Sequence, residues 1–367
     1  MGHVSLSTQT SEIVGNISVI DVDTHFTEPP DLWTSRAPAA WRDRVPHVVD
    51  VNGTPTWILD GIAMSDARAA GVVKADGTKS MGTQFIEWNF EDSHPAAYKV
   101  GPRLQLMDEQ GIWAQIVYPN IVAFAGHKFD QVKDHALRNL CVTIYNDAMA
   151  EFQAESGGRL LPMATLPWWD LDATVREVER IHALGMKGVN TNTDPHNQGL
   201  PDLAERHWDP LWEICSDLNL PVNFHIGASA SSVSWFGDAP WPSFGPEAKI
   251  SIGSAVLYLS NARVLSNLLF SGILERFPTL RFASVESGVG WIPFVLEALD
   301  YQMEETGGVD YLSMKPSEYF RRQVYACFWF ENNSLSEAIR RVGIDNCMFE
   351  TDFPHPTCLY PTPRLSS

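Results

Sequence analysis

Four stretches of the chain place acidic or histidine residues directly after a short apolar run. These stretches are Ile20–His25, Asn223–His225, Val285–Gly288 and Glu350–His355. Residues two apart in a strand point to the same side, so Asp21, Asp23 and His25 would share one side of the first run. Imidazole and carboxylate groups are ligands that suit zinc or manganese. If the four runs end at the same edge, their polar ends could converge on one divalent cation.

The order of the apolar and helical patterns supports such a convergence. From residue 100 onward, short β-rich runs alternate with longer helical patterns, which is typical of βα units around a parallel sheet. We expect strands at Ile17–Asp23, Ile112–Tyr118, Leu160–Leu166, Met186–Thr191, Pro221–His225, Leu280–Glu286, Gln323–Trp329 and Asn346–Thr351. Each run is almost entirely apolar, as in a sheet that is buried on both faces.

Helical patterns fill the gaps between these strands. We expect helices at Pro102–Gln110, Asp130–Ala154, Leu171–Leu184, Asp209–Leu218, Leu257–Phe277, Trp291–Glu304 and Ser334–Val342. The second of these has an acidic N-cap candidate, and Gly111 and Gly185 are C-terminal stop signals. Eight strands with seven interleaved helices predict an α/β fold, a (β/α)₈ barrel. The alternative is an open doubly wound sheet, although no G-x-G-x-x-G motif follows the first strand.

A long insertion, residues 26–100, separates the first strand from the helix that follows it. Within it, Pro46–Gly61 has the pattern of a β-hairpin, with Asn52-Gly53 as a type I′ turn. An insertion after the first strand lies on the C-terminal face of a barrel, which carries the active site in this class of fold.

The domain organisation follows from these limits. We expect one barrel domain over residues 17–356, with an N-terminal tail at 1–16 and a C-terminal tail at 357–367. Only 15 residues follow Asp352, which leaves no room for a closing eighth helix. Either the chain is truncated or the barrel closes in another way.

Composition excludes several classes of partner. Asp and Glu number 45 against 26 Lys and Arg, a net charge of −19, so nucleic acid and anionic membranes are unfavourable partners. No apolar run approaches the roughly 18 to 20 residues of a membrane span, and the polar N-terminus has no secretory signal. The five cysteines are scattered, without a C-x-x-C pair. We expect a cytoplasmic protein that acts on a small molecule.

Three segments carry a resemblance to a known family. Val19–Phe26 (VIDVDTHF), Pro221–Gly227 (PVNFHIG) and Phe349–Pro356 (FETDFPHP) resemble motifs of the metal-dependent amidohydrolase-related family. That family includes aminocarboxymuconate-semialdehyde decarboxylase and the non-oxidative hydroxybenzoate decarboxylases. The resemblance extends over about residues 17 to 356. It implies a distorted (β/α)₈ barrel with one catalytic divalent metal ion, zinc in the first place and manganese as the alternative, and a homodimer.

The resemblance also implies a ligand set. By position, Asp23 and His25 match the first-strand ligand pair, His225 the ligand of the fifth strand and Asp352 the carboxylate of the eighth. The decarboxylase relatives have His-x-His or Glu-x-His where this chain has Asp-x-His. Binuclear members of the wider superfamily use a carboxylated lysine at the end of the fourth strand. Here Lys187 lies near the beginning of that strand, so we expect a single metal ion.

These residues allow two reactions. The first is non-oxidative decarboxylation of a small carboxylated aromatic or unsaturated substrate, and the second is metal-hydroxide hydrolysis of an amide, ester or lactone. Asp352 would be the proton shuttle in both. Glu286, where relatives often have histidine, is a second acid or base, a group that orients a ligand, or a structural carboxylate that caps the Gly288–Trp291 turn. A third hypothesis is a catalytically silent barrel that serves as a scaffold.

The remaining candidate residues each leave two interpretations open. His355 either orients Asp352 or completes the turn between Pro354 and Pro356. Trp329, at the end of the seventh strand, either stacks on a ring of the substrate or belongs to the barrel core. Two arginines, Arg68 and Arg103, could bind a substrate carboxylate or form surface salt bridges. Two histidines, His127 and His196, are expected in loops.

Overall fold

The computed structural model describes residues 17–68, 71–82, 84–120, 122, 124, 129 and 131–361. The tail predicted over residues 1–16, the end of the C-terminal tail from residue 362 and His127 lie outside the described residues. Contacts group the chain into two units. The first spans residues 1–124, 131–163 and 349–367, and the second spans 125–130 and 164–348. The single barrel domain over 17–356 stays a prediction.

A parallel three-stranded sheet positions the first candidate residues. It consists of β1 (Val19–Phe26), β5 (Ile112–Pro119) and β6 (Leu160–Pro162), in the order β1-β5-β6. Helix α2 (Val100–Gln110) contacts β5, and α3 (His135–Glu155) contacts β6. Gly111 ends α2 with φ 72°, which confirms the predicted stop signal. The predicted start of α3 at Asp130 is wrong, because the carboxylate of Asp134 accepts from the first free N–H groups and caps the helix.

The insertion after β1 contains an antiparallel sheet. Its strands are β2 (His47–Val51), β3 (Thr54–Leu59) and β4 (Ile62–Asp66). The predicted hairpin is confirmed, since Asn52 and Gly53 join β2 and β3 with φ 54° and 83°, as a type I′ turn requires. The third strand was not predicted, although Asp60-Gly61 is a second Asp/Asn-Gly turn with positive φ at both positions.

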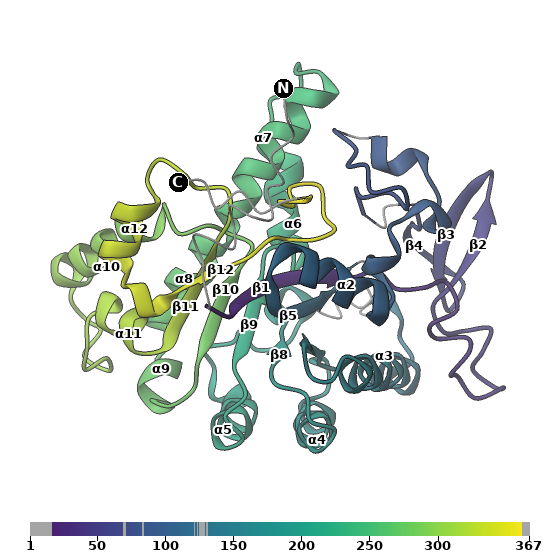
Figure 1. The fold of residues 1–367 in the computed structure, drawn as a ribbon. Coiled ribbons are helices and arrows are strands. Elements are labelled where there is room, and N and C mark those ends of the chain that lie inside the picture. Colours follow the sequence, from purple (N-terminus) through teal and green to yellow (C-terminus); the bar gives the residue numbers. More distant parts are fainter. Residues whose placement is uncertain are drawn as a thin grey trace, which may run out of the picture. The chain divides into compact units, whose positions relative to one another are not determined.

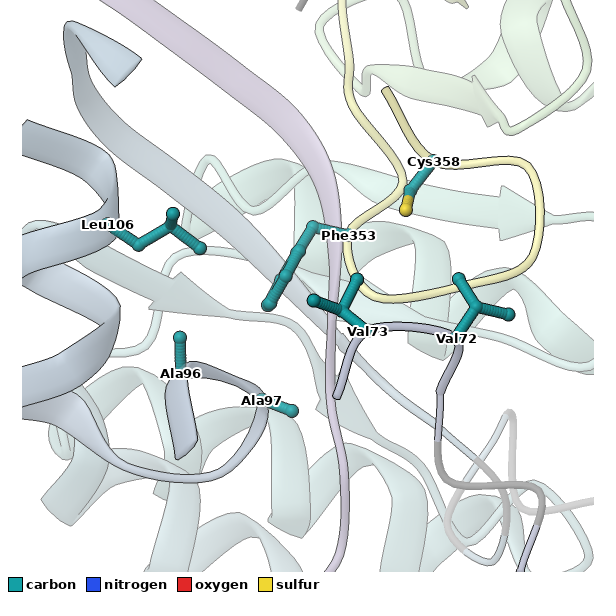
Figure 2. Packing of buried hydrophobic residues seen from close by; sticks show 7 residues of the cluster. All are labelled: Val72, Val73, Ala96, Ala97, Leu106, Phe353 and Cys358. Carbon is teal, nitrogen blue, oxygen red and sulfur yellow. The ribbon is translucent and has the colours of Figure 1, made fainter. Parts of the chain in front are cut away.

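A hydrophobic cluster holds the C-terminal segment within the first unit. Figure 2 shows it, with Val72, Val73, Ala96, Ala97, Leu106, Phe353 and Cys358. Two backbone hydrogen bonds connect this segment to β1, from His25 N to Phe353 O at 2.7 Å and from Asp352 N to Asp23 O at 2.9 Å. The insertion therefore packs against the residue that follows Asp352, and that packing keeps the segment beside β1.

The second unit contains a sheet of mainly short strands. In order these are β12 (Cys347–Phe349), β11 (Val324–Phe328), β10 (Phe282–Val285), β9 (Val222–His225), β8 (Val189–Asn190) and β7 (Ala164–Thr165). The pairs from β7 to β11 are parallel. Each corresponds to a predicted strand, or to half of one where the predicted Leu160–Leu166 strand is divided between β6 and β7.

Helices lie between the consecutive strands of the second unit along the chain, and Figure 1 labels them. They are α4 (Leu171–Ala183), α5 (Asp209–Asp217), α6 (Ala230–Asp238), α7 (Pro246–Tyr258), α8 (Ser260–Phe270), α9 (Ile273–Arg276), α10 (Ile292–Thr306), α11 (Pro316–Gln323) and α12 (Leu335–Val342). The prediction of one helix over Leu257–Phe277 is wrong, because Gly272 has φ 72° and separates α8 from α9. Helices α6, α7 and α11 were not predicted.

Short 3₁₀ turns complete the described secondary structure. They are Gln84–Glu87, Phe90–Asp92, Pro95–Ala97, Pro195–Gln198, Arg206–Trp208 and Ile344–Asn346. After Asp352, the chain as far as residue 361 forms turns and no helix. Within the described part of the chain, no helix combines the length and apolar character of a membrane span.

Candidate metal centre

Strand β1 presents three buried polar side chains at alternate positions, as its sequence predicts. Asp21, Asp23 and His25 are all fully buried. The Asp21 carboxylate accepts hydrogen bonds from Thr351 N at 2.8 Å, Thr351 Oγ1 at 2.6 Å and Gln115 Nε2 at 3.0 Å. Burial raises the pKa of Asp21 to about 6, against the opposing effect of these hydrogen bonds. Asp21 therefore connects β1 to residue 351 through its carboxylate.

His25 lies between two carboxylates. Its Nδ1 is 2.8 Å from the carbonyl oxygen of Pro119, which can only accept, so we assign the proton of the neutral ring to Nδ1. That assignment leaves a lone pair on Nε2, which lies 3.4 Å from Asp23 Oδ1 and 3.5 Å from Asp352 Oδ1. Metal-binding histidines have this arrangement, in which one ring nitrogen donates to a carbonyl and the other faces the metal ion.

Asp352 has an unusual backbone conformation. Its φ of 60° lies in the left-handed region, where residues other than glycine are uncommon. Such a conformation costs of the order of 1 to 3 kcal/mol and persists where surrounding contacts impose it. Burial acts to raise the pKa of the Asp352 carboxyl, but His355 and a protonated His25 would together lower it below its usual range. Burial and the neighbouring charge of Asp352 raise the pKa of Asp23.

His355 contacts Asp352, which favours the orienting interpretation over a purely structural turn. Its Nδ1 is 3.1 Å from Asp352 Oδ1, and its Nε2 is 2.8 Å from Asn120 Oδ1. The ring also stacks on His25, with the centroids 3.6 Å apart. Asn120 was missed in the sequence, although it follows β5 directly, as the other candidates follow their strands. Its Nδ2 donates to Thr27 Oγ1 at 3.0 Å, which orients its amide oxygen toward His355.

The two arginine candidates have other partners. Arg103 is fully buried and donates to Ala96 O at 2.5 Å, Gln115 Oε1 at 3.2 Å and His25 O at 2.5 Å. Arg103 was expected to bind a substrate carboxylate or to form a surface salt bridge. Neither role holds, since its side chain fixes the backbone of His25 and forms no surface salt bridge. Arg68 forms one, because its Nη2 is 2.6 Å from Asp66 Oδ2.

In the second unit, His225 and Glu286 lie at the ends of β9 and β10. His225 Nδ1 is 2.9 Å from the carbonyl oxygen of Ile226, so its Nε2 also carries the lone pair in the neutral ring. The same Nδ1 is 3.6 Å from Glu286 Oε2. Glu286 is the second candidate residue with a left-handed backbone, with φ 52°. Backbone strain at two candidate positions is typical of functional sites.

The turn after Glu286 is capped by another carboxylate. Glu331 Oε1 accepts from Val289 N at 2.9 Å and from Gly290 N at 2.6 Å. Burial raises the pKa of Glu331, and these two hydrogen bonds lower it in part. Glu331 therefore caps this turn, and no pattern in the sequence distinguishes it from other acidic residues. The role of Glu286 stays a prediction.

Trp329 packs against aromatic neighbours, and His196 lies in a loop. The Trp329 ring is buried and packs edge-on against Tyr258, with centroids 5.1 Å apart, and against Phe330, at 4.6 Å. His196 is exposed in the 3₁₀ turn at Pro195–Gln198, as expected.

The first unit alone offers a donor set that fits a divalent cation. Ligand atoms of His25, Asp352 and His355 all lie within 4.8 Å of one another, and Asp23 is adjacent. Two buried carboxylates beside the lone pair of an imidazole create a negative site that a cation would neutralise. The ligand roles themselves stay predictions.

Comparison with known proteins identifies the family. The amidohydrolase family model matches residues 20–364. The chain belongs to the amidohydrolase family. The γ-resorcylate decarboxylase of a Polaromonas species is 28% identical over 262 residues, which are 69% of this chain and 76% of that enzyme.

Two solved amidohydrolase structures are similar over most of the chain. One is an amidohydrolase from Mycobacterium avium subsp. paratuberculosis, with a TM-score of 0.72 and 22% identity, covering 94% of this chain and 91% of that one. The other is a dihydroxybenzoic acid decarboxylase from Polaromonas with bound manganese and 2-nitroresorcinol, with a TM-score of 0.56 and 21% identity, covering 92% and 86%. They confirm the predicted fold class, an α/β protein of the distorted (β/α)₈ barrel type. The family and its decarboxylase members support an enzyme.

Proposed function

We propose that Asp23, His25, His225 and Asp352 together bind one divalent cation. The observation that carries the proposal is the position of His25 Nε2, 3.4 Å from Asp23 Oδ1 and 3.5 Å from Asp352 Oδ1. A buried lone pair beside carboxylate oxygens is unfavourable unless a cation or a proton lies between them. His225 joins the set because of the strand-end pattern and the family, and because its Nδ1 also donates to a carbonyl.

Zinc is the first assignment for this cation and manganese the alternative, since both accept imidazole and carboxylate ligands. The manganese in the similar dihydroxybenzoic acid decarboxylase supports the inclusion of manganese in every test. When bound, the cation would supply positive charge to oxygen atoms of the substrate. The homodimer and the cytoplasmic location stay predictions from the sequence.

We further propose that the enzyme catalyses non-oxidative decarboxylation of a small carboxylated aromatic or unsaturated compound. In this reaction the bond between carbon and carboxylate breaks, carbon dioxide leaves, and the same carbon receives a proton. The similarity to γ-resorcylate decarboxylase supports this reaction. Hydrolysis of an amide, ester or lactone is the alternative that the same donor set could serve.

The surroundings of Asp352 suit the proton transfer. Its Oδ1 is 3.1 Å from His355 Nδ1, so the carboxylate could take a proton from His355 and pass it to the substrate carbon. Asn120 holds the far side of the His355 ring at 2.8 Å, which fixes the ring against Asp352. Glu286 is our second acid or base, and Trp329 the candidate for stacking on a substrate ring.

The metal content of protein purified without chelator is the first test. About one zinc or manganese ion per chain supports the proposed centre, and about two would indicate a binuclear hydrolase. No bound metal, even after reconstitution with either ion, would overturn the metal proposal and favour the scaffold hypothesis.

The reaction is tested with the loaded enzyme and hydroxylated benzoates, with the release of carbon dioxide as the readout. Esters and lactones of similar size serve as matched substrates for hydrolysis. Asp352→Asn should abolish carbon dioxide release while the protein stays folded. Release at the wild-type rate in this variant would remove Asp352 from the role of proton shuttle. Turnover of esters alone would replace decarboxylation with hydrolysis.

A further inference from the structure

A cavity of about 520 Å³ in the second unit lies away from His225. Phe224 of β9 lines it, and because neighbouring residues in a strand point to opposite faces, His225 points to the other face of the sheet. Phe282 of β10 pairs with Val222, so it shares the face of Phe224 and also lines the cavity. Helices α5 and α8 supply further wall residues. The cavity therefore occupies the side of the sheet that helices cover.

Three polar atoms on residues that line this cavity are buried without a hydrogen-bond partner among the described residues. They are Trp212 Nε1, Asp194 Oδ1 and Arg263 Nε. Trp212 is 0% exposed and Asp194 2% exposed. Native structures rarely leave buried donors and acceptors unpaired, and three around one cavity need an explanation.

The second carboxylate oxygen of Asp194 is well paired, which fixes the orientation of its side chain. Asp194 Oδ2 accepts from Arg263 Nη2 at 2.7 Å, from Thr193 Oγ1 at 3.0 Å and from Ser229 Oγ. Burial acts to raise the pKa of Asp194, but these partners hold it below its usual value, so the group is a carboxylate. The residues that line the cavity thus carry one acceptor without a partner among the described residues, Asp194 Oδ1, and two such donors, Trp212 Nε1 and Arg263 Nε.

We propose that this cavity binds a small neutral molecule with a flat apolar ring and at least one hydroxyl group, a compound of the phenol class. A hydroxyl donates one hydrogen bond and accepts others, so one group can satisfy both Asp194 and an N–H donor. The rings of Trp212, Phe224 and Phe282 provide apolar walls for a flat molecule. The volume lies in the range of small-molecule sites, about 300 to 1,000 Å³.

The charges around the cavity exclude ionic ligands. The Asp194–Arg263 ion pair is already neutral as a unit. A carboxylate would bring no donor to Asp194 and would approach the lining residues Asp202 and Glu205 with like charge. An ammonium group would bring no acceptor for Trp212 or Arg263. This inference does not depend on the proposed reaction, because none of the lining residues belongs to the proposed metal ligands.

The test measures binding of resorcinol, a neutral dihydroxybenzene, to the full-length, metal-loaded protein by titration calorimetry. His225→Ala changes no residue that lines the cavity and perturbs the proposed metal centre, so binding that survives in this variant belongs to the cavity. Ala204→Trp places a large side chain at an exposed lining position and should abolish that binding. Trp212→Phe removes one donor and keeps a ring, so affinity should fall about tenfold.

Matched controls separate the cavity from general effects. Trp208 is also buried, but its Nε1 donates to Pro201 O at 3.0 Å and it does not line the cavity, so Trp208→Phe should leave resorcinol affinity unchanged. Benzoate, benzylamine and 1,3-difluorobenzene should bind at least about tenfold more weakly than resorcinol. Equal binding of these compounds, no resorcinol binding in His225→Ala, or unchanged binding in Ala204→Trp would each overturn the proposal. Resorcinol binding by wild-type protein that shows neither metal binding nor carbon dioxide release would contradict only the proposed function.

Discussion

At the residue scale, the two histidines of the proposed centre share one feature. In each, Nδ1 lies within 2.9 Å of a backbone carbonyl, from Pro119 for His25 and from Ile226 for His225. The carbonyls select the ring tautomer that presents Nε2 as a ligand. The sequence indicates which residues can bind a metal ion. It does not indicate the tautomer of each histidine ring, because only the folded chain brings the two carbonyls to Nδ1.

We predict that His225→Ala lowers metal affinity at least about 100-fold, since it removes a ligand outright, whereas loss of an outer-shell partner typically changes affinity 10- to 100-fold. The measurement is zinc and manganese content after dialysis without chelator. His196→Ala, at an exposed histidine of the same unit, is the control and should retain the full content. Full retention in His225→Ala would remove His225 from the ligand set.

His355 gives a second prediction at this scale. Because it contacts Asp352 and stacks on His25, His355→Ala should lower the rate of carbon dioxide release about 10- to 100-fold while most of the metal is retained. The ratio of kcat to metal content distinguishes a loss of proton transfer from a loss of the cation. A variant with normal turnover would return His355 to the role of a turn residue.

At the element scale, the strands were the most predictable part of the fold. Their short, near-continuous apolar runs are typical of buried strands, and polar residues mark where the runs end. Helix α7 was missed because its apolar residues form no regular stripe, and α11 because it spans only Pro316–Gln323. The left-handed backbone at Asp352 and Glu286 has no local signal, since tertiary contacts impose it on residues that rarely adopt it.

The segment around Phe353 provides the prediction at the element scale. Phe353 packs in the cluster of Figure 2 directly after Asp352, so Phe353→Ala should destabilise the protein by about 3 to 5 kcal/mol and reduce its metal content. Urea denaturation and elemental analysis measure the two effects. Trp113→Ala is the control at an aromatic side chain that is 56% exposed, with a loss below about 1 kcal/mol. Equal losses in both variants would contradict the role of the cluster.

At the scale of the whole molecule, long-range contacts and charge determine the hydrogen-bond partners and the cavity, which the sequence does not predict. The fold class and the chemical class of the site follow from local patterns and their order along the chain. The partners of Arg103 and Glu331 do not, because each contacts residues that are distant in sequence. The cavity between the sheet and helices α5 and α8 has no sequence motif at all, since its polar atoms come from separate elements.

The dependence of stability on pH tests the ionised state of Asp194. Its folded pKa is lowered, so its contribution to stability is present above about pH 4, the unfolded value, and is lost as the pH falls through the folded pKa. Asp194→Asn removes the charge beside Arg263, whose side chain is 32% exposed, and should destabilise the protein by about 2 kcal/mol at pH 7. The difference from wild type should shrink below pH 4 in urea denaturation. The control Glu213→Gln, at an exposed position of α5, should change stability by less than about 0.5 kcal/mol at any pH. A difference between Asp194→Asn and wild type that stays constant down to pH 2 would mean that the carboxylate is not the stabilising partner of Arg263.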